Sequence, residues 1–339
     1  MTITIQQALA IVLDHKDLDS QQMEQVMNQI MQGEATPSQI AGFVIALRMK
    51  GESINELAAA AKVMRNLSTK VEVGLDDLVD TCGTGGDGSK TFNISTASAI
   101  VAASAGVNIA KHGNRSVSSK SGSADVLEAL GVRLDLEAKQ VARCVQDVGI
   151  GFMFAPMHHS SMKHAAGPRK ELAVRTLFNL LGPLTNPAGA KRQVMGVFDN
   201  AWLEPIAHVL KSLGAQKALV VHADDGLDEL SIAAASQVCE LSQGNIDTYQ
   251  VTPESLGLAR SDLGEIQVED VTQSAAMIKN VLAGELGAAA DIVALNAGAA
   301  IFVADKADSL ELGVSMAQDR IRSGAAKEKL NQLIMFTNQ

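Results

Sequence analysis

Residues 80–96 read Asp80-Thr-Cys-Gly-Thr-Gly-Gly-Asp-Gly-Ser-Lys-Thr-Phe-Asn-Ile-Ser-Thr96, and four of the six positions from Gly83 to Gly88 are glycine. An apolar pair precedes this stretch and a small apolar run follows it, which predicts strand, turn and helix in that order. Glycines let a ligand reach backbone N–H groups, and the first turn of a helix favours an anion. The stretch therefore predicts a phosphate-binding loop, although a glycine-rich turn without a ligand has the same composition.

Two familiar nucleotide patterns nearly fit this loop. Gly83, Gly85 and Gly88 have the G-x-G-x-x-G spacing of a dinucleotide site, which needs an acidic residue after the next strand to hold a ribose diol. The next predicted strand runs instead into Lys111-His-Gly-Asn-Arg115, a cationic cluster that suits further phosphate. The nucleoside-triphosphate P-loop fails by one residue, because Ser89 separates the last glycine from the lysine.

The cationic cluster opens a second polar loop. Lys111-His-Gly-Asn-Arg-Ser-Val-Ser-Ser-Lys-Ser-Gly-Ser123 places five serines and two glycines among four basic positions, and then enters a predicted helix. Hydroxyls, free N–H groups and cationic side chains together neutralise and orient a polyanion. A mobile surface loop has a similar composition, so this element alone is ambiguous. The two loops together favour a ligand with phosphate at more than one place.

An acidic turn follows the predicted strand Ala218–His222. Asp224-Asp-Gly-Leu-Asp-Glu229 has four carboxylates in six positions, without the ligand ladder or the bidentate glutamate of an EF-hand. Magnesium needs only one or two protein carboxylates when substrate phosphates supply other ligands, and the adjacent Asp228 and Glu229 suit that role. Composition alone favours the alternative, a solvated acidic turn.

An aromatic and methionine-rich stretch, Phe152-Met-Phe-Ala-Pro-Met-His-His-Ser-Ser-Met-Lys-His164, precedes Arg169. Such side chains suit a flat aromatic acid, whose carboxylate the guanidinium would pair. Taken singly, each histidine is more often a hydrogen-bonded structural residue. His158, His159 and His164 lack the spacing of a zinc enzyme, so no metal site is predicted there.

Bulk composition limits the partners and the compartment. The 339 residues carry a formal charge of −10, which argues against nucleic-acid and anionic-membrane binding. Apolar runs are too interrupted to span a membrane, and the N-terminus lacks a signal-peptide pattern. Cys82, Cys144 and Cys239 show neither metal-ligand spacing nor a disulfide framework, which predicts a reducing cytoplasm. Cys82 fits the glycine-rich turn as a small structural residue.

The chain changes its pattern near residue 73. Residues 1–72 show helical periodicity, and four short helices bury so little that we expect them to pack on a second subunit or on the main domain. Residues 73–339 alternate strands with helices, which predicts an α/β domain with a central, mainly parallel sheet flanked by helices. The predicted strands are Leu78–Thr81, Val107–Lys111, Gly151–Ala155, Val194–Val197, Ala218–His222 and Ile292–Leu295. The predicted helices lie near 95–105, 124–130, 137–147, 202–213 and 273–283, with further helical patterns at Pro168–Leu180 and Leu310–Phe336.

The ordered motifs resemble those of the anthranilate phosphoribosyltransferase family over essentially the whole chain. They comprise Asp80–Asp87, Asn93–Thr96, Lys111–Arg115, Gly122–Asp125, Phe154–Pro156, Lys163-His164, Arg169–Leu172, Arg175-Thr176, Gly182–Pro187 and Gly226–Ser231. The resemblance implies transfer of a phosphoribosyl group from phosphoribosyl pyrophosphate (PRPP) to the amine of anthranilate, in tryptophan biosynthesis. It also implies a small helical domain through which two subunits pair as a homodimer, joined by helices near 168–185.

The resemblance also implies the site residues. PRPP would be bound by Gly83, Gly86, Asp87, Thr91, Asn93, Ile94, Ser95, Thr96, Lys111, His112, Gly113, Asn114, Arg115, Ser116, Val117, Ser118, Ser119 and Ser123. Anthranilate would contact Gly83, Asn114 and Arg169, and two Mg²⁺ ions would be held by Ser95, Asp228 and Glu229. No catalytic base is assigned, and His112 is only a weak candidate.

Two alternative functions share features with this sequence. A pyrimidine nucleoside phosphorylase has a related fold but needs no magnesium-binding pair such as Asp228 and Glu229. A non-catalytic nucleic-acid-binding relative is opposed by the charge of −10 and by the intact phosphate and metal motifs.

Overall fold

The computed structural model describes residues 3–116 and 121–339. The chain begins with four helices, α1 (Ile5–Leu13), α2 (Ser20–Met31), α3 (Pro37–Lys50) and α4 (Ile54–Leu67). Each helix starts at a capping box, whose N-cap residue is Thr4, Asp19, Thr36 or Ser53 and whose third helical residue is Gln or Glu. Because a capping box satisfies two free N–H groups from within one turn, the local sequence sets where these helices begin.

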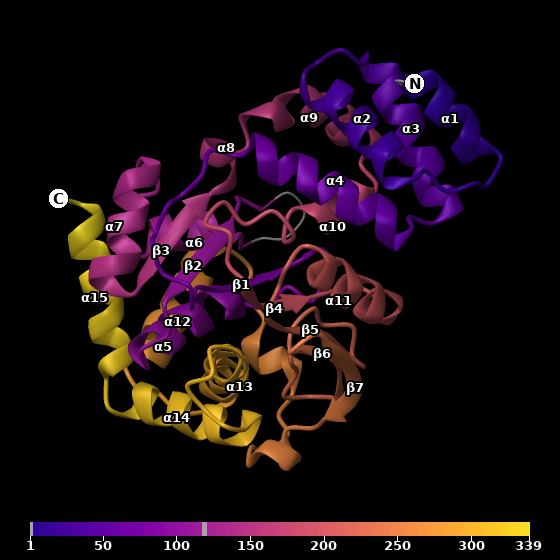
Figure 1. Cartoon of the computed structure of the whole chain (residues 1–339). Helices are drawn as coiled ribbons and strands as arrows, with labels where there is room; N and C mark the ends of the chain where they lie inside the picture. Colours follow the sequence, from indigo (N-terminus) through magenta and orange to yellow (C-terminus); the bar gives the residue numbers. More distant parts are fainter. Residues whose placement is uncertain (1–2, 117–120) are drawn as a thin grey trace.

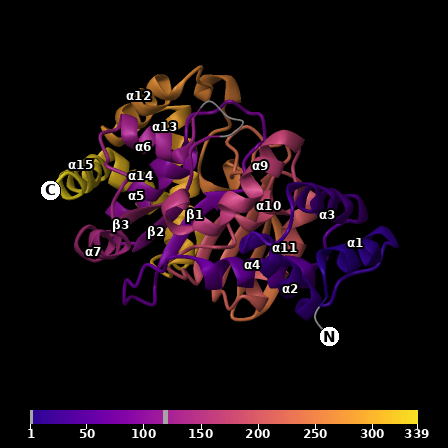
Figure 2. The same ribbon diagram turned by 90° about the horizontal axis from the view of Figure 1, so that it is seen from above.

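The first four helices pack against two later ones, α9 (Lys163–Leu172) and α10 (Leu177–Leu181). We call these six helices the helical lobe. Its apolar core, which includes Phe43, Leu57 and Phe178, continues without interruption onto Met195 and Val220 of the sheet. The lobe lies at one end of the molecule, and the C-terminal helix lies at the opposite end (Figures 1 and 2). As expected of short helices, those of the lobe bury part of their apolar surface against later segments of the chain.

A single seven-stranded sheet forms the centre of the rest of the chain, with strand order β3-β2-β1-β4-β5-β6-β7. The strands are β1 (Val79–Gly83), β2 (Ile109–Gly113), β3 (Ile150–Phe154), β4 (Arg192–Gly196), β5 (Lys217–Ala223), β6 (Ser236–Ser242) and β7 (Asn245–Val251). The first five strands run parallel, and β6 and β7 are antiparallel. A helical bundle beside a mainly parallel sheet confirms the predicted fold class.

Helices cover both faces of the sheet. They are α5 (Ile94–Ser104), α6 (Ser123–Ala129), α7 (Ala138–Val148), α8 (Ala155–His158), α11 (Leu203–Ser212), α12 (Val271–Leu282), α13 (Ala288–Val303), α14 (Leu310–Arg322) and α15 (Ala325–Thr337). Short 3₁₀ turns lie at Ser160–Met162, Asn200–Trp202, Glu254–Leu256 and Leu263–Ile266.

Alternate side chains of a strand point to opposite faces of the sheet. Val194 of β4 therefore packs on the side of α5 and α13, whereas Met195 packs on the side of α11.

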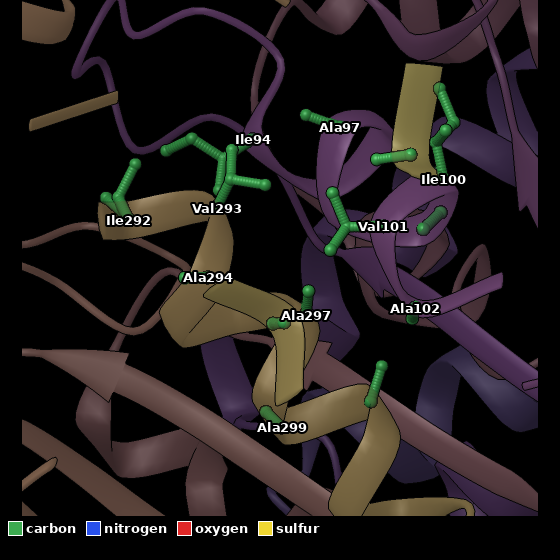
Figure 3. Close-up of a cluster of buried hydrophobic side chains, with 14 of the residues drawn as sticks. Ile94, Ala97, Ile100, Val101, Ala102, Ile292, Val293, Ala294, Ala297 and Ala299 are labelled. Carbon is green, nitrogen blue, oxygen red and sulfur yellow. The ribbon is translucent and has the colours of Figure 1, made fainter. Parts of the chain in front are cut away.

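Two nearly apolar helices, α5 and α13, fill the middle of one of these layers. Their small and branched side chains, among them Val101, Val293 and Ala297, are fully buried. Figure 3 shows the two helices side by side, with side chains between them. A helix that is apolar on all sides is stable only in a core. Because α5 is fixed in this way, its N-terminus is a rigid edge for the loop that precedes it.

Four sequence expectations differ from the structure. Ile292–Leu295 is not a strand but part of α13, because a short apolar run has no period that separates a strand from a buried helix. Strands β6 and β7 were not predicted; β7 has one partner strand and polar residues at most positions. Leu310–Phe336 is two helices divided near Gly324, whose φ is +75°. Pro168–Leu180 is likewise interrupted after Leu172.

The strand order reverses between β1 and β4. The chain passes from β1 to β2 and β3 on one side, and then returns to β4 on the other side. Ligands of parallel sheets bind at such a reversal, beyond the carboxyl ends of the strands. Gly83 of β1 is paired there with Gly196 of β4.

Candidate active site

Two paired glycines make room for the acidic turn. A Cβ atom on Gly83 would lie 2.6 Å from Oδ2 of Asp228, and one on Gly196 would lie 1.5 Å from the Asp228 carbonyl oxygen. The Asp228 carboxylate also accepts a hydrogen bond of 2.7 Å from the N–H of Gly85. The structure thus brings the glycine-rich loop and the acidic turn into direct contact. Gly196 was not predicted to matter, although a glycine at the end of a strand often marks such a close approach.

The start of α5 is organised by Asn93. Its Oδ1 accepts hydrogen bonds from the N–H of Thr96 at 3.0 Å and from the hydroxyl of Ser95 at 3.4 Å. Its side-chain amide donates to the carbonyl of Ser121, at 2.8 Å. Asn93 therefore caps the helix and ties it to the end of the second polar loop. The Thr96 hydroxyl is buried without a partner among the described residues, and Ile94 is a core side chain.

Lys111 reaches from β2 under the start of α5. The side chain is almost fully buried, and its Nζ donates to Ser95 Oγ at 3.2 Å and to the carbonyl of Thr81. Burial lowers the pKa of Lys111, and the charge of Asp80 opposes this effect. Asp80 is itself held by Asn186 Nδ2 at 2.7 Å and by the N–H of His112 at 3.1 Å. Neither Asp80 nor Asn186 was predicted to support the site, because their contact spans distant parts of the chain.

The acidic turn presents two crowded carboxylates. Burial raises the pKa of Asp228 to about 7, and the neighbouring charge of Asp87 adds to this effect. Burial and the charge of Asp228 raise the pKa of Glu229 well above its usual range, while Lys111 opposes the rise. The backbone of the turn is fixed by Asn296 of α13, whose side chain bonds both the N–H and the carbonyl of Leu230. Without a bound cation, the turn therefore disfavours two adjacent negative charges beside the glycine-rich loop.

The second polar loop is described on both sides of residues 117–120. Arg115 pairs with Glu128 at 2.8 Å and Asp125 at 3.0 Å, and its guanidinium lies 5.6 Å from the ring centre of Phe154. Ser123 donates to the carbonyl of Asn114 at 3.3 Å. The loop thus folds back on the start of α6. The predicted contacts Val117, Ser118 and Ser119 lie outside the described residues.

The far end of the glycine-rich loop rests on a segment near Leu263–Ile266. Thr91 forms an isolated bridge with Gln267, and the N–H of Phe92 donates to the carbonyl of Ile266 at 3.0 Å. Thr91 therefore lies at an anchoring point of the loop. Its hydroxyl is 3.2 Å from that of Ser89.

The residues predicted to bind anthranilate lie around the junction with the helical lobe. Arg169 of α9 has its guanidinium 5.4 Å from the ring centre of Phe178 and makes no hydrogen bond or ion pair with the described residues. Burial lowers its pKa. The structure does not bring Arg169 into contact with Gly83 or Asn114. It does leave a partly buried guanidinium that no carboxylate of residues 3–116 or 121–339 pairs with.

Three histidines gather near the same junction. The rings of His112 and His159 have centres 5.0 Å apart, and His158 Nδ1 lies 3.1 Å from the carbonyl of Thr69. Burial lowers the pKa of all three, that of His159 to about 4. Among the described residues, the Nε2 atoms of all three are buried without a partner, and no group of three or more His, Cys, Asp or Glu side chains is arranged to hold a metal ion. The histidines are therefore predominantly neutral at pH 7.

Comparisons with known proteins agree with this geometry. Residues 75–327 match the α/β domain of a glycosyl transferase family, and residues 6–68 match the helical bundle domain of that family. The chain is 61% identical to anthranilate phosphoribosyltransferase of Thioalkalivibrio sulfidiphilus, over 98% of each sequence. Fold and site thus define a transferase of the glycosyl transferase class.

Solved structures narrow the class further. Anthranilate phosphoribosyltransferase from Thermus thermophilus has a TM-score of 0.93 and 43% identity, over 98% of this chain and 99% of that one. The enzyme from Saccharomyces cerevisiae, solved in complex with PRPP and Mg, has a TM-score of 0.90 and 26% identity, over 98% of each chain. A second yeast structure, with 4-fluoroanthranilate, has a TM-score of 0.87 and 25% identity, over 98% of each chain. The chain belongs to the anthranilate phosphoribosyltransferase family.

This membership confirms the predicted enzyme class, a phosphoribosyltransferase of tryptophan biosynthesis, over the phosphorylase and nucleic-acid-binding alternatives. Among the described residues, no helix has the length and apolar character needed to cross a bilayer.

Proposed function

We propose that this protein transfers the phosphoribosyl group of PRPP to the amine of anthranilate beyond the carboxyl ends of β1 and β4. One observation carries the proposal: the glycine-rich loop, Lys111 and the Asp228–Glu229 pair meet at this edge of the sheet. Backbone N–H groups, a buried cation and paired carboxylates are the groups that a metal-bound pyrophosphate needs.

PRPP would lie between the two polar loops. The proposed contacts are Gly83, Gly86, Asp87, Thr91, the Asn93–Thr96 segment, the Lys111–Ser119 segment and Ser123. The start of α5 supports this placement, because it has free N–H groups and a positive dipole end. The buried ammonium of Lys111 would stabilise charge that develops on the departing pyrophosphate.

The acidic turn fits a divalent cation. Two adjacent, partly buried carboxylates with raised pKa values repel each other, and a cation relieves that repulsion. We assign Asp228, Glu229 and the Ser95 hydroxyl to two Mg²⁺ ions. Bound there, magnesium supplies electrostatic stabilisation of the leaving pyrophosphate. Calorimetric titration with Mg²⁺ and PRPP would count the ions.

Anthranilate would enter from the side of the helical lobe, with its carboxylate near Arg169 and its ring near Gly83 and Asn114. The yeast enzyme in complex with 4-fluoroanthranilate supports an aromatic acid as the acceptor. The partly buried guanidinium of Arg169, which has no ion-pair partner in the part of the chain that the structure describes, supports the orientation.

The chemistry then depends mainly on charge and position. Breaking the bond between C1 and pyrophosphate leaves a ribose with oxocarbenium character, and the amine adds from the opposite face with inversion. Holding the amine in line with C1 makes the encounter effectively unimolecular. The histidines His112 and His159 are kept neutral by burial, so they add no positive charge near the oxocarbenium.

The direct test is the loss of anthranilate fluorescence with purified protein. Turnover is expected only when PRPP and Mg²⁺ are both present. Absence of turnover under these conditions, or turnover of a pyrimidine nucleoside with phosphate, would refute the proposed function.

Replacing Arg169 with Ala is expected to raise KM for anthranilate by about 10-fold or more, since one charged hydrogen-bonding partner of the carboxylate is lost. The KM for PRPP should stay within about twofold. Steady-state kinetics with each substrate varied in turn checks this. Lys170→Ala, at an exposed neighbour on the same helix, is the control. An effect confined to PRPP would place Arg169 in the other site.

Replacing Ser123 with Ala is expected to weaken PRPP binding about 3- to 10-fold, the loss of one hydroxyl contact. Calorimetry with PRPP and Mg²⁺ measures the Kd directly. An unchanged Kd would remove Ser123 from the donor site. Ser119, which lies outside the described residues, is assigned to the same site and should behave alike.

We also propose that the protein is a homodimer and that it is located in the cytoplasm. We assign residues 1–72, with the helices near 168–185, to a dimerisation domain and residues 73–339 to the transfer domain. Met49 and Val174 support this: both are exposed apolar side chains beside the hydrogen bond from Arg48 to Arg175. Sedimentation velocity would test the homodimer. The three free thiols support a cytoplasmic location, which cell fractionation would test.

A further inference from the structure

Arg175 lies between α9 and α10 and connects the helical lobe to the glycine-rich loop. Its Nη2 donates a hydrogen bond to the carbonyl oxygen of Gly86. Its guanidinium lies 4.3 Å from the ring centre of Phe198, which follows β4. Its own carbonyl accepts a hydrogen bond from Arg48 at the end of α3. One residue therefore contacts the lobe, the edge of the sheet and the loop.

The aromatic partner of Arg175 is itself fixed to the loop. The N–H of Phe198 donates to Thr84 Oγ1 at 3.0 Å, and the N–H of Thr84 donates to the carbonyl of Gly196 at 2.9 Å. The ring on which the guanidinium stacks is thus tied to the first residue after β1. Arg175 cannot shift along this ring without changing its distance to Gly86.

The hydrogen bond to Gly86 determines how one peptide group points. A trans peptide is planar, so the carbonyl of Gly86 and the N–H of Asp87 point in opposite directions. Because Arg175 holds the carbonyl, the N–H of Asp87 faces away from the guanidinium. Gly86 has φ +79° and no side chain that limits its rotation. The hydrogen bond from Arg175 is therefore the main restraint on the Gly86–Asp87 peptide. The N–H of Gly85, two residues before Asp87, is held separately by Asp228.

We propose that Arg175 is a positioning residue, which fixes the Gly86–Asp87 peptide for the donor phosphates and makes this orientation depend on the helical lobe through Arg48. The inference rests on the proposed function, since it takes PRPP as the ligand of the loop. It assigns to Arg175 no contact with either substrate.

Arg175→Ala is expected to raise KM for PRPP about 10-fold, while KM for anthranilate stays within about twofold, because a misoriented N–H weakens only the phosphate contact. The melting temperature should change by less than about 2 °C, as for a partly exposed side chain. Arg175→Lys should not restore the KM, because an ammonium lacks the planar fork that stacks on a ring while donating sideways.

Two further variants separate positioning from general damage. Arg48→Ala should raise KM for PRPP by a smaller factor, about threefold, and add little to Arg175→Ala, because both act through one contact chain. Arg143→Ala is the control, since that side chain is 72% exposed on α7 and its one ion pair with the described residues is to Asp147. It should leave both KM values unchanged.

A measurement on the ligand-free protein tests the role of Arg175 independently of catalysis. Hydrogen exchange of amides 84–88 in the ligand-free protein should be faster in Arg175→Ala than in wild type, and unchanged in Arg143→Ala. Unchanged exchange together with an unchanged KM for PRPP would overturn the role of Arg175. An equal rise of both KM values with a lowered melting temperature would also overturn it, as a purely structural effect. An inactive wild type would refute the proposed function instead.

Discussion

Changing Asp228 to Asn and Glu229 to Gln together is expected to lower magnesium-dependent turnover by about 1000-fold or more, while the protein stays folded. The double variant keeps the shape of both side chains but removes the two charges that face the glycine-rich loop. Without them, no carboxylate pair remains at this position to hold a cation. Anthranilate fluorescence at saturating substrates, over a range of Mg²⁺ concentrations, measures the loss.

The same double substitution is expected to stabilise the metal-free protein at neutral pH, although it lowers turnover. Both carboxylates have raised pKa values in the folded protein, so the folded state binds more protons than the unfolded state. Without metal, wild-type stability should therefore fall as pH rises from the unfolded pKa of Asp228, about 4, to its folded pKa of about 7. Thermal melts in chelator should show a smaller fall for the double variant.

The matched control is Asp224→Asn, in the same turn. Asp224 is exposed and accepts a hydrogen bond from Gln237 at 3.2 Å, away from the glycine-rich loop. Its removal should leave turnover and its magnesium dependence unchanged. Undiminished activity of the Asp228/Glu229 variant would rule out the assignment of the metal ligands.

Gly196→Ala is expected to cost about 3 kcal/mol or more of folding free energy and most of the activity, because the new methyl group has no room. It would lie 1.5 Å from the carbonyl oxygen of Asp228 and 2.5 Å from its carbonyl carbon. These are backbone atoms held by Asn296 through Leu230, so the whole acidic turn would have to move. Urea unfolding and turnover, measured on the same preparation, check both effects.

Gly167→Ala gives the comparison at a glycine without such a neighbour. Gly167 lies inside α9, and a Cβ atom there would meet nothing within 4 Å. Alanine is the better helix former, so this variant should be neutral or up to about 1 kcal/mol more stable. If Gly196→Ala unfolds at the same urea concentration as wild type, the close approach of Asp228 to β4 is wrong.

Many of the helices and strands of this protein can be predicted from short stretches of its sequence. The helices of the lobe start at capping boxes, and the five parallel strands end near the predicted positions. The acidic pair Asp228 and Glu229 comes after β5, and the cationic cluster begins inside β2, so both lie toward the carboxyl ends of strands, where a parallel sheet gathers functional groups. Ile292–Leu295 was misassigned, because its burial comes from α5, a helix far away in the sequence. Strands β6 and β7 were missed, because the polar β7 depends on its neighbour more than on its own residues.

The sequence by itself indicated the fold class, the two predicted phosphate loops and the acidic turn, because glycine content, capping residues and charge act over a few positions. Only the tertiary structure decided that Gly83 and Gly196 lie side by side beneath Asp228, that Asn186 supports Asp80, and that Arg175 reaches Gly86. The pairs Gly83–Gly196, Gly85–Asp228, Gly86–Arg175 and Asp80–Asn186 each join segments about 90 or more residues apart. Such contacts follow from strand order and register, which no local pattern encodes.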